Sequence, residues 1–295
     1  MHYGGAFLTS KYKVLKHLDK SNLPTTVLVQ PKTSFSDIEQ LLIENKIAYP
    51  LIVKPDKGER GKGVEKINTS KDLRLHHKRF EQITFLIQEY IDYTIELGIL
   101  FFWDKNDKPI ISSVTQKSFC SITGNGTDCF GTLVQQKERI QHRIKIIRKR
   151  FEKQWNTIPS DGEKILLEPI GNHNKGTMFL DARHMLSTEM LHWTKSCAEK
   201  VPGFDYGRFD IKIKQWNAFS STNKNDIKIM EVNGVNSEPC HIYDPSYTLI
   251  KTYKDIFYHM RIIYELSKQK KRAKDRLMPF LKTGCKVALN KIPYA

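Results

Sequence analysis

The chain has 295 residues, 39% of them hydrophobic, which is enough to bury one large core or two to three lobes. Its net charge of +16 predicts a surface that attracts polyanions such as nucleotides, nucleic acids or anionic lipids. No apolar run reaches the roughly 20 residues of a membrane span, the N-terminus lacks a signal-peptide core, and the cysteines form neither a disulfide nor a zinc pattern, so we expect a cytoplasmic protein.

The N-terminal part of the chain predicts helices and strands in alternation. Ser36, followed by Glu39, has the spacing of a capping box and predicts the start of a helix. The strands are predicted from apolar and β-branched runs bounded by turn residues. The expected elements are a helix at 36–46, a hairpin of strands at 49–56 and 64–67, a helix from Ser70, and strands at 85–91 and 95–103.

The middle and C-terminal parts add two helices and a pair of strands. The segment 135–155 predicts an amphipathic helix with a solvated basic face, because apolar residues recur in it at helical spacing. The alternating runs 207–214 and 226–234 predict an antiparallel pair. From Leu249 a second apolar stripe predicts a C-terminal helix that packs on the core. The two stripes are Ile140, Ile144, Ile147, Phe151 and Trp155, and Tyr253, Ile256, Phe257, Met260, Ile263 and Tyr264.

A glycine-rich loop stands out in the stretch LIVKPDKGERGKGVEKI, residues 51–67. It is not a Walker loop, because Val64 stands where a lysine is required, and no helix obviously follows it as in a dinucleotide fingerprint. Glycines let backbone N–H groups approach phosphate oxygens, and Lys54 would supply a positive charge. Two interpretations stay open, a phosphate-binding hairpin and an exposed charged turn.

Three oxygen-bearing side chains are expected to meet on the strand pair near the C-terminus. Asp210 alternates with apolar neighbours in one strand, and Glu231 and Asn233 share one face of the other. Two carboxylates and an amide suit Mg²⁺, which binds few protein ligands together with phosphate oxygens and water. The alternative is a surface strand with ordinary polar residues.

The order of these motifs resembles the ATP-grasp superfamily, and within it carboxylate–amine ligases such as D-alanine:D-alanine ligases and the ATP-grasp part of cyanophycin synthetase. The resemblance covers roughly residues 10–265. It implies an α+β fold in which two lobes with mainly antiparallel sheets clasp a nucleotide. The matching segments are LIVKPDKGERGKGV (51–64), LIQEYIDYTIELGI (86–99), SITGNGTDCFGTLV (121–134), GRFDIKI (207–213) and MEVNG (230–234).

The resemblance also implies a domain organisation. The expected segments are a short N-terminal segment at 1–20, a small lobe with the glycine loop at 21–92, a large lobe with the metal and substrate site at 93–268, and a basic tail at 269–295. Relatives carry an additional N-terminal lobe, which we expect to be reduced or absent here. Its substrate contacts would then come from a second subunit in a homodimer, from a protein partner, or from the segment 171–184.

Site residues follow from the resemblance residue by residue. Lys54 and Arg208 would serve catalysis by neutralising the transferred phosphoryl group, and one or two Mg²⁺ ions would bind Asp210, Glu231 and Asn233. Glu96 would hold the ribose. The remaining ATP-binding residues would be Gly58, Gly61 and Gly63 in the loop, Gln88, Glu89, Tyr90 and Ile91 at the adenine, and Lys117, for which a solvated strand end is an equal alternative. The substrate candidates are His173, Asn174, Lys175, Glu238 and His241.

The implied reaction activates a carboxylate with ATP as an acyl phosphate, which an amine then attacks, releasing ADP and phosphate. The substrates would be small molecules, and an acidic or phosphorylated one would suit the basic charge. The segment EVNGVNSEP departs from the EVNTxPG of D-alanine:D-alanine ligases and argues against that substrate pair. Two alternatives stay open: a nucleotide-binding regulatory or scaffold protein, and a nucleic-acid-binding protein, although the basic run 268–276 contains no aromatic residue.

Overall fold

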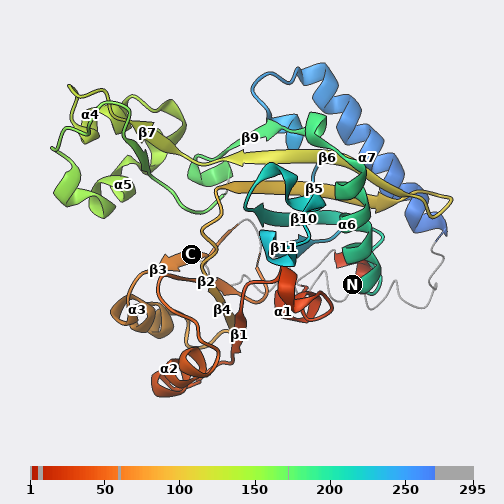
Figure 1. Cartoon of the computed structure of the whole chain (residues 1–295), viewed down its shortest axis with the longest axis horizontal. Helices are drawn as coiled ribbons and strands as arrows, with labels where there is room; N and C mark the ends of the chain where they lie inside the picture. The colour runs from red at the N-terminus through yellow and green to blue at the C-terminus, as the bar shows by residue number, and fades with distance from the viewer. Residues whose placement is uncertain (1, 6–8, 59–60, 172, 270–295) are drawn as a thin grey trace. The chain divides into compact units, whose positions relative to one another are not determined.

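A computed structural model describes residues 2–5, 9–58, 61–171 and 173–269 (Figure 1). The chain forms two compact units: unit 1 comprises the outer parts, up to Gln116 and from Leu180, and unit 2 is Lys117–Phe179. No helix in the described residues is long and apolar enough to cross a membrane. The expected basic tail, apart from Gln269, lies outside the described residues.

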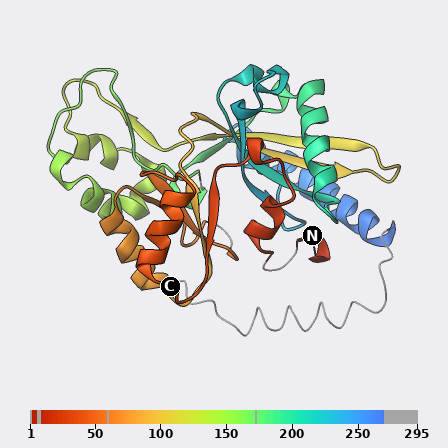
Figure 2. The ribbon, with the colours of Figure 1, turned by 60° about the horizontal axis from the view of Figure 1, so that its bottom comes forward.

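The first sheet of unit 1 is antiparallel throughout. Its order is β1 (Thr26–Val29), β4 (Phe85–Glu89), β2 (Leu51–Pro55) and β3 (Glu65–Ile67). Helices α2 (Phe35–Glu44) and α3 (Ser70–Phe80) pack on one face, where Ile38, Leu42 and Leu73 join the apolar side chains of the strands (Figures 1 and 2). Strands β2 and β3 pair as the expected hairpin, and the opposite face of the sheet carries Lys54 and Gln88 together with buried Leu86.

The predicted start of α2 at Ser36 is wrong. The hydroxyl of Ser34 accepts the backbone N–H of Asp37 at 3.2 Å, so Ser34 is the N-cap and the helix begins at Phe35. The Ser36 hydroxyl instead lies 2.9 Å from that of Ser34. Either Ser34 or Ser36 could have been the N-cap of this helix. Ser34 is the cap because its extended backbone places the side-chain oxygen over the N–H groups of the first turn.

The second sheet of unit 1 has the order β11 (Ile227–Asn233), β10 (Tyr206–Ile213), β5 (Ile95–Trp103), β6 (Pro109–Ser118) and β9 (Met178–Asp181). Helix α6 (Thr188–Lys200) packs on the face that carries Phe209 and Ile211. Helix α7 (Leu249–Gln269) packs on the opposite face, against Phe102 and Tyr206. The expected antiparallel pair near the C-terminus is β10 and β11, and the predicted α+β class with antiparallel sheets is confirmed.

Helix α7 packs on the core as expected, but the prediction of its buried face is correct only for part of the stripe, such as Ile263. Tyr253, Phe257 and Tyr264, members of the predicted stripe, are more than half exposed, whereas His259, Ile262 and Leu266 are buried. His259 explains the difference, because its Nδ1 lies 3.0 Å from the hydroxyl of buried Tyr206 and its ring stands edge-on to Phe102. A count of apolar residues alone cannot find a face whose centre is a histidine.

Unit 2 is built around a two-stranded sheet, β7 (Ser121–Thr123) and β8 (Lys164–Leu166), with helices α4 (Phe130–Gln135) and α5 (Ile144–Arg150). The helix predicted over 135–155 is broken by 3-10 turns at Glu138–Arg143 and Glu152–Gln154. Its apolar face is nevertheless correct, because Ile140, Ile147 and Trp155 are buried in the core of the unit. The helical period survives the break, while the hydrogen-bond pattern does not.

The remaining helices and turns are short. They are helix α1 (Lys11–Leu15) and 3-10 turns at His2–Gly5, Lys20–Asn22, His173–Lys175, Arg183–Met185, Trp216–Ser220, Lys224–Asp226 and Cys240–Tyr243.

Candidate functional site

The register of the second sheet brings the predicted metal-binding residues together. Asp210 lies opposite Glu231, and Arg208 opposite Asn233, with a bulge immediately after Asp210. The amide of Asn233 donates to Oδ2 of Asp210 at 3.3 Å. These side chains point to the face of the sheet on which α7 packs, because they share the alternation of Tyr206.

Arg208 and Asp210 form a two-pronged ion pair. Nε of Arg208 lies 2.7 Å from Oδ1 and Nη2 lies 3.0 Å from Oδ2 of Asp210, while Nη1 contacts the sulfur of Cys240 at 2.8 Å. Burial disfavours the guanidinium charge, but Asp210 outweighs burial and raises the pKa of Arg208. Gly98 leaves room for this pair, since a Cβ there would lie 3.2 Å from the Arg208 side chain. The guanidinium is therefore fixed in position by Asp210 and Cys240.

Lys54 reaches the same residues from the first sheet. Its side chain is 6% exposed, and Nζ donates to the carbonyl of Met230, the residue before Glu231, at 2.8 Å. Burial lowers the pKa of Lys54 to about 8, although the nearby carboxylates of Glu231, Asp210 and Glu96 oppose the shift. The buried ammonium thus lies among three carboxylates.

The glycine loop is fixed at its root by the N-terminal helix. Nζ of Lys11 donates to the carbonyl of Gly58 at 2.6 Å and lies 3.4 Å from Oε1 of Glu231. Gly61 and Gly63 have φ angles of 67° and 69°, which side chains rarely adopt, so the turn favours glycine at both positions. Sequence reasoning missed Lys11, since no local pattern connects it to residues so far along the chain.

Gln88 carries a buried amide oxygen that accepts no hydrogen bond from the described residues, on the same face of the first sheet as Lys54. Its Nε2 donates to the hydroxyl of Thr26 at 2.9 Å, and that hydroxyl donates its own hydrogen to the carbonyl of Pro24. The group facing Thr26 must therefore be the NH₂, which leaves Oε1 as the acceptor without a partner among the described residues. A ligand with an amino group would satisfy it, and the adenine base of ATP has one.

The neighbours of Gln88 form the connection between β4 and β5. Oε2 of Glu89 accepts the backbone N–H of Thr25 at 3.1 Å, so this carboxylate is held by the residue that precedes β1. The carbonyl of Ile91 accepts from Nζ of Lys212 at 2.8 Å. Glu96, the predicted ribose ligand, is 8% exposed and lies opposite Lys212 in the register. Sequence reasoning missed Lys212, which occupies the same strand face as Asp210.

The donor set fits Mg²⁺ when the ion is shared with a ligand. The described residues contain no group of three or more His, Cys, Asp or Glu side chains that could hold a metal by themselves. Asp210, Glu231 and Asn233 supply two carboxylates and an amide, the hard oxygen donors that Mg²⁺ combines with phosphate oxygens and water. These residues would hold the ion, and the ion would neutralise phosphate charge.

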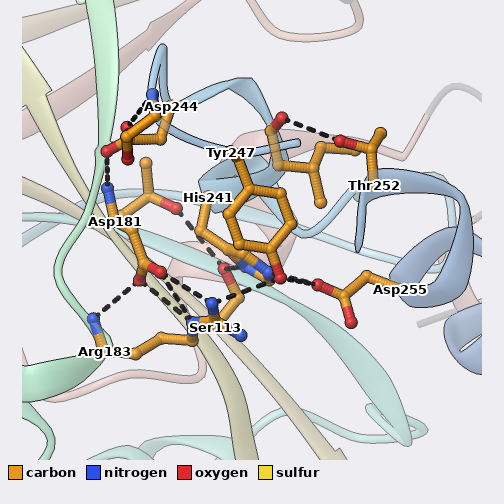
Figure 3. A network of polar contacts seen from close by, with 11 residues as sticks. Ser113, Asp181, Arg183, His241, Asp244, Tyr247, Thr252 and Asp255 are labelled. Carbon is orange, nitrogen blue, oxygen red and sulfur yellow. Dashed lines mark hydrogen bonds and ion pairs between the residues drawn. The ribbon is translucent and has the colours of Figure 1, made fainter. Parts of the chain in front are cut away.

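His241 lies in a polar network rather than in an open pocket (Figure 3). Its Nε2 lies 2.8 Å from Asp255 and its Nδ1 lies 2.7 Å from the hydroxyl of Ser113, and the ring is 1% exposed. Burial lowers the pKa of His241, so the ring is neutral at pH 7. Because the carboxylate can only accept, Nε2 carries the hydrogen and Nδ1 accepts from Ser113.

This network joins several elements of unit 1. Tyr247 also donates to Asp255, Arg183 forms an ion pair with Asp181, and the N–H of Asp181 donates to Asp244 at 2.7 Å (Figure 3). Ser113 is 1% exposed, so its hydroxyl cannot reach a substrate in this arrangement. The network therefore fixes the loop after β11 against β6 and α7. This loop also contains Cys240, the residue before His241, which contacts Arg208.

The other predicted residues lie elsewhere. Glu238 is exposed in unit 1 and accepts a hydrogen bond from Tyr243. Lys117, at the end of β6, and His173, Asn174 and Lys175 belong to unit 2. Burial and then Arg139, whose Nη2 is 3.4 Å from Nε2 of His173, lower the pKa of that histidine. A role for these residues stays a prediction.

Comparisons with known proteins give matches among structures. No family model matches the chain, and neither does any curated protein. D-alanine–D-alanine ligase from Bacillus anthracis matches with a TM-score of 0.50 and 13% identity, over 90% of this chain and 70% of that one. At this identity the likeness shows the fold alone.

Two further matches have lower TM-scores. The VanG D-Ala:D-Ser ligase from Enterococcus faecalis has a TM-score of 0.46 and 13% identity over 86% of this chain, and a bifunctional glutathione synthetase from Pasteurella multocida has 0.46 and 15% over 84%. The chain spans 62% and 36% of these two proteins, respectively.

Proposed function

We propose that this chain, whose fold is the ATP-grasp fold, is an ATP- and Mg²⁺-dependent ligase that joins a carboxylate to an amine. The observation that carries the proposal is the cluster of Lys54, Arg208, Asp210, Glu231 and Asn233, which two sheets supply from distant parts of the chain. Burying a lysine and an arginine beside two carboxylates is costly, and such an arrangement is more typical of a functional site than of a site that only stabilises the fold.

Each residue has a role that its surroundings support. Asp210, Glu231 and Asn233 would hold one or two Mg²⁺ ions, and Lys54 would contact the phosphates. Arg208, fixed by Asp210 and Cys240, would stabilise charge on the transferred phosphoryl group. The nucleotide base would lie against Gln88, whose amide oxygen accepts from no described residue, and the ribose against Glu96.

The chemistry would proceed through an acyl phosphate. A carboxylate oxygen attacks the terminal phosphorus of ATP, and the bond to ADP breaks. The amine then attacks the acyl carbon and releases a proton to solvent, and phosphate leaves with the electron pair of the C–O bond. Phosphoryl transfer needs mainly positioning and charge neutralisation, which this cluster is built to give.

The proposed organisation keeps two lobes, 21–92 with the first sheet and 93–268 with the second. The partners would be a small carboxylate and a small amine. Lys117, His173, Asn174, Lys175 and Glu238 remain candidates for contacts with the nucleotide or the substrates. A cytoplasmic location agrees with the use of ATP, and a second subunit or protein partner would complete the substrate site.

The test uses hydroxylamine as a general amine. The purified chain is incubated with Mg²⁺–ATP, hydroxylamine and pools of carboxylic acids, and ADP and hydroxamate are measured together. A ligase gives both in equal amounts for at least one pool, and Asp210→Asn abolishes them. If no pool gives hydroxamate and heparin or RNA, but not ATP, raises Tm in a salt-sensitive way, the chain is a polyanion-binding protein instead.

A further inference from the structure

Lys212 is a buried cation on the strand that carries Arg208 and Asp210. Its side chain is 7% exposed, and alternation along β10 puts it on the same face as those two residues. Burying an ammonium is costly unless polar groups surround it, so an apolar residue would be less costly at this buried position of β10. Lys212 therefore needs an explanation beyond core packing.

The ammonium of Lys212 holds the connection between the two sheets. Nζ donates to the carbonyl of Ile91 at 2.8 Å, in a buried hydrogen bond. It also lies 5.4 Å from the ring centroid of Tyr90, which has Lys66 at 3.7 Å. Lys212 thus contacts two consecutive residues of the connection, Ile91 at its backbone carbonyl and Tyr90 at its ring.

The ends of the connection are fixed by other bonds. The backbone N–H of Glu89 donates to the carbonyl of Thr25 at 2.9 Å, and the hydroxyl of Tyr93 donates to the carbonyl of Asn225 at 2.7 Å. Between these points, Ile91 is held through its carbonyl by Lys212. The charge of Lys212 has a counterpart in Glu96, which lies opposite it in the register.

We propose that Lys212 is a positioning residue for the nucleotide base. By holding the carbonyl of Ile91, it fixes the direction of the backbone N–H and C=O groups that would contact adenine, and so lets the chain distinguish adenine from hypoxanthine. This inference rests on the proposed function, because it requires a nucleotide at this site. It does not require the carboxylate or the amine to be known.

Comparing two bases tests this role, because adenine and hypoxanthine differ in which positions donate and which accept hydrogen bonds. Adenine presents an amino group beside a ring acceptor, and hypoxanthine presents a carbonyl beside an N–H, so a fixed backbone that suits one opposes the other. If Lys212 acted through its charge on the phosphates, ATP and ITP would be affected equally. The two roles therefore give different results.

The experiment measures the dissociation constants of Mg²⁺–ATP and Mg²⁺–ITP by calorimetry for the wild type, Lys212→Met and Lys212→Arg. Lys228→Met is the matched control, since Lys228 lies on the neighbouring strand and also donates to a backbone carbonyl, that of Ser21 at 2.8 Å. We expect Lys212→Met to weaken ATP binding about tenfold and to leave ITP binding within about twofold. Lys212→Arg should recover part of the preference, and Lys228→Met should retain it.

The possible failures are distinct. Equal weakening of ATP and ITP by Lys212→Met, or the same loss of preference in Lys228→Met, overturns the positioning role. Unchanged ATP binding in Lys212→Met overturns it as well. If the wild type binds neither nucleotide, the proposed function itself fails and the inference falls with it. Thermal unfolding of each unliganded variant shows whether Lys212→Met has merely unfolded, in which case Lys212→Arg supplies the comparison.

Discussion

Arg208 engages both carboxylate oxygens of Asp210, at 2.7 and 3.0 Å, although the two residues lie on the same strand. Residues two apart on a strand point to the same face, so a long side chain can fold along the strand onto a short one. The pair places a guanidinium against a carboxylate that is only 4% exposed, and this offsets part of the cost of burying the two charges.

Replacing Asp210 by Asn should abolish the response to Mg²⁺–ATP. The amide of the variant places an N–H group against the guanidinium of Arg208 and removes the charge that Mg²⁺ would need. In the wild type, ATP at about a hundred times its dissociation constant should add about 2.7 kcal/mol to the free energy of unfolding. Thermal unfolding with and without Mg²⁺ measures this, and Asp205→Asn, at the position immediately before β10, is the control. A Mg²⁺-dependent shift that survives in Asp210→Asn rules out the metal site.

ATP binding should become weaker as the pH rises through about 8. In the free chain the pKa of Lys54 is lowered to about 8, and bound phosphates would raise it again by favouring the ammonium. Binding near pH 8.5 should therefore take up a fraction of a proton. Calorimetry in two buffers of different ionisation enthalpy measures this uptake. Lys54→Met should bind weakly and without proton uptake, and an equal uptake in that variant would exclude Lys54 as its source.

Gln88→Met should separate stability from binding. The substitution removes a buried acceptor that has no partner in the described residues, together with one hydrogen bond to Thr26. These effects oppose each other, so the free energy of unfolding should change by less than about 1 kcal/mol, while ATP binding weakens about tenfold. Denaturant unfolding and calorimetry provide the two values. Gln40→Met on the exposed side of α2 should change neither, and full ATP affinity in Gln88→Met would show that its oxygen makes no contact with the base.

His76 should make the chain less stable in acid. Burial, and then the charges of Arg79 and His77, lower its pKa to about 4, whereas a histidine in the unfolded chain has a pKa near 6.5. Between these values the unfolded state binds the extra proton, so stability rises with pH over this window. His76→Leu should remove about 2 kcal/mol of the difference between pH 5 and pH 7 in urea unfolding. Exposed His192→Gln should leave the difference unchanged, and if His76→Leu does so too, His76 is not the titrating group.

The two faces of α7 should respond differently to truncation. Ile262 is 9% exposed and Met260 is 59% exposed. Ile262→Ala should cost about 2–4 kcal/mol of unfolding free energy, and Met260→Ala less than about 0.5 kcal/mol. Denaturant unfolding of both variants tests the orientation of the helix. The reverse order would restore the apolar stripe as the buried face.

Much of the second sheet could be predicted because strand geometry is local. Alternation alone places Asp210 on one face of β10 and Glu231 with Asn233 on one face of β11, and pairing of adjacent strands does the rest. The glycine loop was equally visible, since positive φ angles favour glycine.

The remainder could not be predicted, because it depends on contacts between distant segments. Lys11 meets Glu231, and Lys212 meets Ile91, through pairs that leave no mark on their local sequence. The prediction of the buried face of α7 was incomplete for a related reason, because His259 is buried against Tyr206 of β10. Local patterns predict elements and faces, whereas partners require the fold.

The division of the chain into units has a consequence for biosynthesis. Unit 1 joins segments on both sides of unit 2, and β10 of one segment pairs with β5 of the other. During synthesis on the ribosome, β5 emerges long before its partner β10. Unit 2, in contrast, is continuous in sequence and emerges as one segment. We expect unit 2 to fold before the second sheet is complete, because that sheet can close only after β10 has left the exit tunnel. Nascent chains of increasing length, probed by proteolysis, would show protection in that order.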